Sequence, residues 1–281
     1  MLSRAVVLAA GILVLAGCAG RMQKTPSPCE GKKTTAEAIE ALNQRCKMTR
    51  PIRAAGQCLL RYHAEGKEHK ENFPVKLWFN PPDEIYLQGD IAFNAAGLVI
   101  GSNAEEFWFW LKPKEISTYW WGKWSQAGVW NRLAISPTVM LEAFGDVNVR
   151  QGDWALSRSG DFDLLSLYNE QNALLQKVYI ERCDYVVAKV ERLDAAGDVF
   201  FKAQFADYEK ISEGFFVPKQ IKMTAVSNDA NEDSVEISLV SVQPTQLSEQ
   251  QRQRLFVRPK PLGFDHVYKI VNGKAIEQTL E

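Results

Sequence analysis

The chain is poor in the residues on which many enzymes and nucleic-acid-binding proteins depend. Among its 281 residues there are only three histidines, and 33 basic residues are balanced by 34 acidic ones, for a formal net charge of −1. No strongly basic cluster stands out along the sequence, and such a cluster is what attracts a phosphate backbone. We therefore predict no nucleic-acid partner.

The usual motifs of catalytic and cofactor sites are also missing. The sequence contains no G-x-S-x-G nucleophile elbow, no glycine-rich phosphate loop and no H-E-x-x-H zinc motif. His63 and His69 flank a charged turn, which favours a solvated surface role. Asp161 and Asp163 fall in "SGDFD", which is typical of a turn. These absences predict a protein with no enzymatic activity, no metal and no cofactor.

The one long apolar run lies at the N-terminus and is too short to span a membrane. "MLSRAVVLAAGILVLAG" places Arg4 before about a dozen apolar residues, whereas a spanning helix needs about 20. The run ends in "LAGC", and small residues before Cys18 resemble a bacterial lipoprotein signal. We predict that residues 1–17 are a signal peptide and that Cys18 is the lipidated first residue of the mature chain. The alternative is an ordinary secretory signal followed by an incidental cysteine.

The segment that follows is polar and contains two prolines. Residues 18–33 are predicted to be a tether, which as a coil would span roughly 20 Å. Two or more acyl chains anchor a protein stably, so the expected membrane attachment is the N-terminal lipid. Ala19 follows the cysteine. The chain therefore lacks the Asp at this position that is typical of an inner-membrane retention signal in enterobacteria. This favours the periplasmic face of the outer membrane.

Four further cysteines are Cys29, Cys46, Cys58 and Cys183, and none belongs to a C-x-x-C motif. An oxidising compartment would permit disulfides between them. Four cysteines allow three pairings. Our hypothesis is that Cys29 pairs with Cys46, tying the tether to the first helix, and that Cys58 pairs with Cys183, cross-linking two strands.

Strand patterns dominate residues 34–281, which are predicted to form one domain. Helical spacing is found in "TTAEAIEALNQRCKM", in "SPTVMLEAF" after a capping Ser136 and before Gly145, and in "SEQQRQRLF". Between them lie about ten or eleven short apolar strands separated by turns, without the helical crossovers of a parallel sheet. The fold class is therefore mainly β: one large, curved antiparallel sheet with helices packed on it.

"EEFWFWLKPKEISTYWWGKW", residues 105–124, breaks the alternation expected of a half-buried strand. Phe107 and Phe109 fall on one face while Trp108 and Trp110 fall on the other, so both faces are aromatic. One interpretation is an exposed contact surface for a partner, formed by Trp108, Trp110 and Trp120. The alternative is that turns or loops of the chain fold over this face.

The order of elements resembles the periplasmic lipoprotein-localisation family of the LolA/LolB type. The similar stretches are "LVIGSNAEEFWFWLKPKEIST", "SPTVMLEAFG", "VERLDAAGDVFFKAQFADYE", "GFFVPKQIKM" and "LFVRPKPLGFDHV". The resemblance implies an unclosed antiparallel β-barrel of about eleven strands, with helices covering its concave face. One departure is "NPPDEIYL", where Asp83 and Glu84 stand in place of an Arg in the family's carrier.

The resemblance also implies a role in binding acyl chains or lipoproteins, in lipoprotein sorting or lipid transfer. Exposing one sixteen-carbon chain to water costs on the order of 12 kcal/mol, so a carrier must offer a dry apolar groove. The alternative is an envelope interaction or assembly module that uses the fold without cargo and contacts other envelope proteins. The groove candidates, which could equally be ordinary core residues, are Leu77, Phe79, Tyr86, Phe93, Phe107, Phe109, Trp121, Val187, Phe201 and Phe205.

Overall fold

The computed structural model describes residues 29–64, 66–91, 94–112, 116–126, 137–144, 152–226 and 232–279. Several sequence predictions concern residues outside these ranges. They are the signal peptide, the lipidated cysteine and most of the tether (residues 1–28), the groove candidate Phe93, the helix cap Ser136 and the helix exit Gly145.

The three predicted helices are confirmed as α1 (Thr35–Met48), α2 (Pro137–Ala143) and α3 (Glu249–Phe256); a short 3-10 helix, η1, covers Trp124–Gln126. Thr34 caps α1 in a capping box with Glu37, and Ser248 caps α3 in the same way with Gln251. Within the described ranges, no helix combines the length and apolarity needed to cross a membrane.

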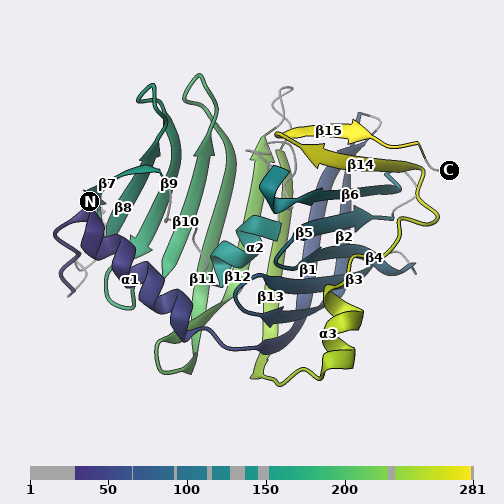
Figure 1. The fold of residues 1–281 in the computed structure, drawn as a ribbon, viewed down its shortest axis with the longest axis horizontal. Coiled ribbons are helices and arrows are strands. Elements are labelled where there is room, and N and C mark those ends of the chain that lie inside the picture. Colours follow the sequence, from purple (N-terminus) through teal and green to yellow (C-terminus); the bar gives the residue numbers. More distant parts are fainter. Residues whose placement is uncertain are drawn as a thin grey trace, which may run out of the picture.

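The strands form one open sheet of fifteen strands in the order β15-β14-β6-β5-β4-β3-β2-β1-β13-β12-β11-β10-β9-β8-β7 (Figure 1). Neighbours are antiparallel except β14 and β6, which are parallel. Their bounds are β1 (Ile52–Ala64), β2 (Lys67–Asn80), β3 (Glu84–Ile91), β4 (Asn94–Ser102), β5 (Glu106–Leu111), β6 (Thr118–Lys123), β7 (Asp153–Ser159), β8 (Phe162–Tyr168), β9 (Leu174–Glu181), β10 (Val187–Leu193), β11 (Val199–Ser212), β12 (Phe215–Val226), β13 (Glu232–Pro244), β14 (His266–Val271) and β15 (Lys274–Glu277).

The predicted mainly-β, unclosed sheet is confirmed, but the count of about eleven strands was too low. Two of the strands that the count missed are β14 and β15, in what the sequence suggested was a tail. They are only six and four residues long, too short for a clear alternation. They are joined by Asn272 and Gly273, both with positive φ, and Asn-Gly is the strongest short hairpin signal. That dipeptide could have revealed them.

Helices α1 and α2 lie against the same face of the sheet (Figure 1), which we call the helix-covered face. Helix α1 contacts β7 and β8, whereas α2 contacts β3, β4, β5 and β12. The main core lies between this face and the two helices. In β2, Phe73, Val75, Leu77 and Phe79 are buried while the residues between them are not, as a two-residue period requires.

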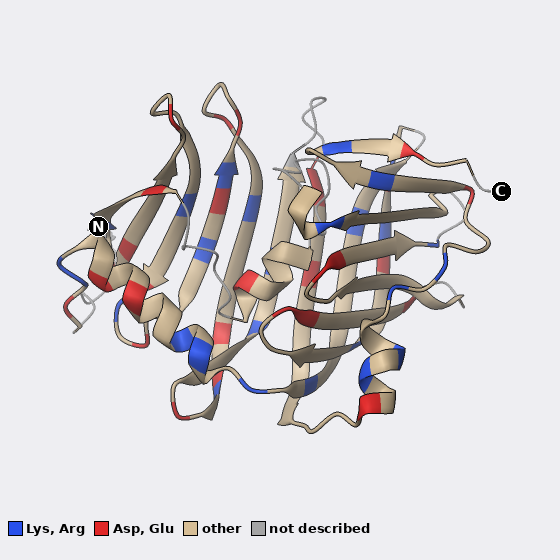
Figure 2. Cartoon of the chain, in the orientation of Figure 1, with Lys and Arg blue, Asp and Glu red and all other residues tan. Residues whose placement is uncertain are grey.

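The opposite side of the sheet is called the outer face. In β2, for example, the exposed Lys76 lies on this face, and basic and acidic residues are interspersed along the strands and the helices (Figure 2). A second apolar cluster lies on this face at β4, β5 and β6. The sheet therefore has two apolar faces in one region and a single one elsewhere.

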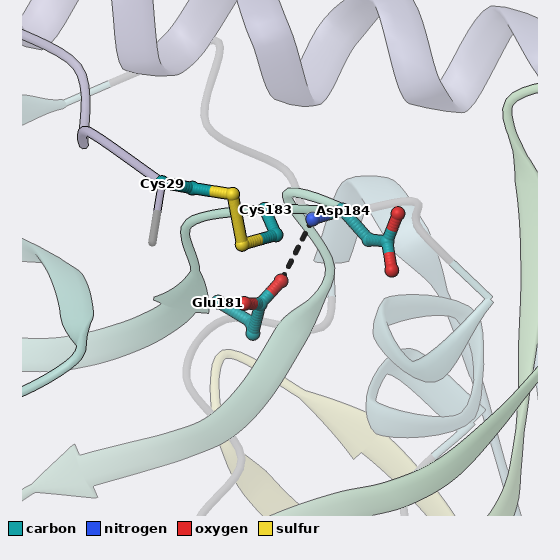
Figure 3. The surroundings of a disulfide bond; sticks show 4 residues. All are labelled: Cys29, Glu181, Cys183 and Asp184. Carbon is teal, nitrogen blue, oxygen red and sulfur yellow. Dashed lines mark hydrogen bonds between the residues drawn. A yellow bond between two sulfur atoms is a disulfide. The ribbon is translucent and has the colours of Figure 1, made fainter. Parts of the chain in front are cut away.

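The structure corrects the predicted disulfides, because Cys29 bonds Cys183 (Figure 3). The Cα atoms of this pair are 5.1 Å apart. Helix α1 rises about 1.5 Å per residue away from Cys29, which carries Cys46 out of reach at the far end of the helix. Cys58 is fully buried in β1, and burial raises its thiol pKa to about 12.

The segment leading into α1 is also held by the fully buried side chain of Asp163 in β8. This carboxylate accepts a hydrogen bond of 2.7 Å from the backbone N–H of Lys32 and forms an ion pair with Arg182 at 3.3 Å. A Cβ atom on Gly31 would lie 1.9 Å from an oxygen of Asp163, so the chain can pass here only with glycine. Residues 29–33, predicted to belong to the tether, are thus attached to the sheet.

Replacing both disulfide cysteines, Cys29→Ser with Cys183→Ser, is expected to lower the free energy of unfolding by about 2–4 kcal/mol, because the crosslink closes a long loop in the unfolded chain. Urea unfolding followed by circular dichroism would measure this. Reductant should destabilise the unmodified protein by a similar amount and leave the double variant unchanged. Equal stability of the variant and the oxidised protein would contradict the assigned pairing.

Candidate functional site

Most groove candidates lie where the sequence placed them, on the helix-covered face. Phe107 is buried and its ring lies 4.7 Å from that of Trp124, which packs against the main core. The six candidates in the main core itself, all at most 4% exposed, are Leu77, Phe79, Phe109, Val187, Phe201 and Phe205. They come from four strands, β2, β5, β10 and β11, and the sheet brings them onto one continuous apolar surface.

Two groove candidates and one partner-face candidate fall on the wrong face. Tyr86 and Trp121 pack against the outer cluster, whereas Trp120 packs against the main core. Strand pairing gives the reason: Trp120 lies opposite Phe109, with the ring centroids 4.5 Å apart. In "TYWWG" two adjacent tryptophans offer no alternation to follow, and a shift of one residue exchanges the faces.

Helix α2 seals the apolar surface at its centre. All but one of its seven residues are buried, and the following residue, Phe144, stacks on Phe79 with ring centroids 5.0 Å apart. The buried carboxylate of Glu142 forms an ion pair of 2.9 Å with Arg192 of β10, whose guanidinium lies 5.5 Å from the ring centroid of Phe201. Only one charged contact therefore joins α2 to the sheet among the ion pairs described here.

The gap between α1 and α2 is almost filled. It holds a cavity of about 20 Å³ lined by residues of α1, α2, the start of β10 and the β11–β12 turn. Pockets for small ligands measure about 300–1,000 Å³. Among the described residues, the space between α1 and α2 is therefore too small for an acyl chain.

Two charged side chains line this cavity, Arg45 of α1 and Glu142 of α2. Arg45 donates a hydrogen bond of 3.2 Å from Nη1 to the carbonyl of Gly214, and its guanidinium lies 4.5 Å from the ring centroid of Phe216. Burial lowers the pKa of Arg45, and the nearby charge of Asp184 opposes that shift. The cavity therefore has a polar rim next to an apolar floor.

The outer aromatic cluster is covered by the chain itself, so Trp108 and Trp110 do not form an exposed partner face. Trp108 is fully buried and Trp110 is 8% exposed. The segment after α3 lies over them: the ring centroid of Phe264 is 5.9 Å from that of Trp110, and Tyr119 donates a hydrogen bond of 2.9 Å to the carbonyl of Pro259. The prediction of an exposed contact surface was wrong, and the alternative of an overlying loop is confirmed.

Charged residues hold the same C-terminal segment in place. Arg258 lies 4.0 Å from the ring centroid of Trp121 and pairs with Glu106 at 2.8 Å. Glu84, one of the acidic residues that depart from the carrier pattern, pairs with Arg252 of α3 at 2.8 Å. The acidic residue thus serves to dock α3.

In the described part of the chain, His63 and His266 each form an ion-pair contact with a single carboxylate. His63 lines a polar cleft on the outer face, and its Nδ1 lies 3.1 Å from Oδ1 of Asp233. Within the described part of the chain, no group of three or more His, Cys, Asp or Glu side chains is placed to hold a metal ion.

Comparison with known proteins places the fold. No family model and no curated protein matches the sequence. A domain from Vibrio parahaemolyticus described as an outer membrane lipoprotein-sorting protein matches with a TM-score of 0.52 and 14% identity over 78% of this chain and 95% of that domain. A DUF1329 family protein from Desulfovibrio piger matches with a TM-score of 0.52 and 11% identity over 80% of this chain and 100% of that protein.

A LolA superfamily protein from Nitrosomonas europaea is also similar, with a TM-score of 0.49 and 13% identity over 81% of this chain and 99% of that protein. At these identities the likeness concerns the fold. The resemblance to the lipoprotein-localisation fold that the order of motifs indicated is confirmed at this level.

Trp108→Ser is expected to lower the free energy of unfolding by about 3–5 kcal/mol, because it removes a fully buried side chain from the outer cluster. Phe264→Ala, in the covering segment, should destabilise the same cluster. As a matched control, Trp78→Ser changes a partly exposed tryptophan of the same face and should cost much less. Thermal unfolding would compare the stabilities of the three variants. A Trp108→Ser protein that stays stable but no longer binds a partner would support the interpretation that Trp108 belongs to an exposed contact surface.

Proposed function

We propose that this protein binds the acyl chain of a lipid or lipoprotein on the helix-covered face, in the place now occupied by α2. The observation that supports this most directly is the way in which α2 packs on the sheet. This seven-residue helix covers a continuous apolar surface and is joined to it by one described ion pair, Glu142–Arg192. The role is one of binding and transfer, without catalysis.

The free energy gained by burying the side chains of α2 on this surface is comparable to that gained by burying an acyl chain there. Moving α2 away would expose four large apolar side chains, those of Val139, Met140, Leu141 and Phe144, besides the smaller Pro137 and Ala143. The four large ones alone cost roughly 6–12 kcal/mol, taking about 1.5–3 kcal/mol for each. Burying a sixteen-carbon chain in the same place returns on the order of 12 kcal/mol. The exchange is therefore nearly balanced, which is what a protein that must both take up and release its ligand requires.

The second candidate function is a non-catalytic interaction or assembly module of the cell envelope. One observation favours it: the cavity between the helices measures only about 20 Å³. In that case α2 would be a permanent part of the core, and acyl chains would not bind.

We further propose that the domain is attached to the periplasmic face of the outer membrane through a lipid on Cys18, since "LAGC" follows the only long apolar run of the sequence. Cys18→Ala is expected to release the full-length protein into the soluble fraction on cell fractionation, because no acyl anchor would remain. Radiolabelled palmitate should be incorporated into the unmodified chain and not into the variant. Unchanged membrane association of the variant would refute the lipid anchor.

Acyl binding can be mapped with palmitic acid that carries a photoreactive diazirine. In β11 we expect labelling of Phe201, Ala203 and Phe205, which lie on the helix-covered face, and none of the intervening Lys202 and Gln204. Residue-level mass spectrometry would read this two-residue period. Labelling of both sets alike, or of neither, would favour the interaction module.

Two matched variants of β10 test whether α2 must move. Arg192→Met leaves the buried carboxylate of Glu142 without its partner, which destabilises the closed position of α2 and should accelerate labelling several-fold. Lys189→Met breaks an ion pair of 2.9 Å with Glu191 on the same strand, away from α2, and should leave the rate unchanged. Equal rates in the two variants would mean that α2 does not control access.

A further inference from the structure

Two residues of opposite charge that line the cavity between α1 and α2 each have a buried side-chain atom without a hydrogen-bond partner in the described part of the chain. These atoms are Nη2 of Arg45 and Oε2 of Glu142. A buried polar atom without a partner destabilises the folded protein, and does so more strongly when the group is charged. A cation and an anion that both lack one contact at the same place point to a site for a ligand with complementary groups.

Each side chain already uses one of its polar atoms in a contact with the protein. Nη1 of Arg45 is engaged by the carbonyl of Gly214, and the face of the guanidinium is covered by Phe216. Oε1 of Glu142 is engaged by Arg192. Both side chains are therefore oriented in advance, with Nη2 as a charged donor and Oε2 as a charged acceptor.

The cavity lies at the edge of the apolar surface, so the two charged residues are next to that surface. Phe144, Val187 and Phe215 line the cavity together with the two charged residues, and all three belong to the main core beneath α2. A lipid whose tail lies on this surface cannot bury its polar head there, because a polar group without partners is costly in an apolar setting. The polar rim between α1 and α2 is where the head would stay.

We propose that the gap between α1 and α2 receives the head of an aminophospholipid, with Arg45 donating to a phosphate oxygen and Glu142 accepting from the ammonium group. This assignment rests on the acyl-binding function proposed above and specifies its ligand. Arg45 alone would favour any anionic lipid. Glu142 repels a head that has negative charge only and attracts one that also carries an N–H donor. In the closed protein the cavity of about 20 Å³ admits no more than one water molecule, so the head enters as α2 shifts and the gap widens with Glu142 still at its edge.

The test compares three lauroyl probes: lysophosphatidylethanolamine, lysophosphatidylglycerol and the uncharged monoacylglycerol. Titration calorimetry would give their dissociation constants for the soluble domain. The unmodified protein is expected to bind the ethanolamine lipid most tightly. Arg45→Met should weaken both phospholipids about tenfold or more, while the monoacylglycerol, which has no anionic group, binds as before. Arg45→Lys, which keeps the charge, should restore part of the loss.

Glu142→Gln should abolish the preference for ethanolamine over glycerol, since the amide keeps a partner for Arg192 and presents no negative charge to the ammonium group. Arg192→Met is the matched control: it breaks the same ion pair but retains the Glu142 carboxylate. It should therefore change all affinities together and leave their ratio unaltered. Circular dichroism of each variant would check that the sheet is intact.

The outcomes separate this inference from the function on which it rests. If none of the probes binds the unmodified protein, the acyl-binding function fails and the inference fails with it. If all three bind, and Arg45→Met and Glu142→Gln leave their relative affinities unchanged, acyl binding stands and head recognition is refuted. A loss of monoacylglycerol binding in Arg45→Met equal to that of the phospholipids would show Arg45 to be structural, and would refute the inference as well.

Discussion

An open sheet has two faces, and in the region of β4 to β6 both of them are apolar in this protein. Phe109 and Trp108 are adjacent in β5 and point to opposite sides, and both are almost wholly buried. Each side then needs its own cover. Helix α2 covers one side, and the segment between α3 and β14 returns across the other, where Phe264 meets the aromatic rings. Much of the order of elements after β6 follows from this double requirement.

The two covers are attached differently. The outer cover is continuous with β14, which pairs with β6, and it is held by the Tyr119–Pro259 hydrogen bond and by Arg258, so removing it would break the sheet. Helix α2 pairs with no strand and is held by apolar contacts and one ion pair. The helix-covered face is consequently the one that can be uncovered while the sheet remains whole, and a binding function is more compatible with it than with the outer cluster.

The start of the domain is fixed at the other end of the sheet. Cys29 and Asp163 hold the segment before α1 against β8 and the β9–β10 turn, near the outermost strands (Figure 3). In the proposed lipoprotein, eleven residue steps would separate the anchor on Cys18 from Cys29, a reach of at most about 40 Å. The membrane-facing side of the domain would then be set by the disulfide, and α1, whose far end carries Arg45, would begin at that side.

The sequence by itself determined the helices, most of the strands and the helix-covered face, because caps such as Thr34 and alternating residues such as Leu77 and Phe79 act through local geometry. It could not decide the face of Trp120 against Trp121, since adjacent aromatics carry no period and only pairing with Phe109 sets their register. The partner of Cys29, the cover over Trp108 and the placement of Arg45 and Glu142 around one cavity also came only from the tertiary structure. Each joins residues far apart in the chain, and nothing in the local sequence around either residue specifies the distance between them.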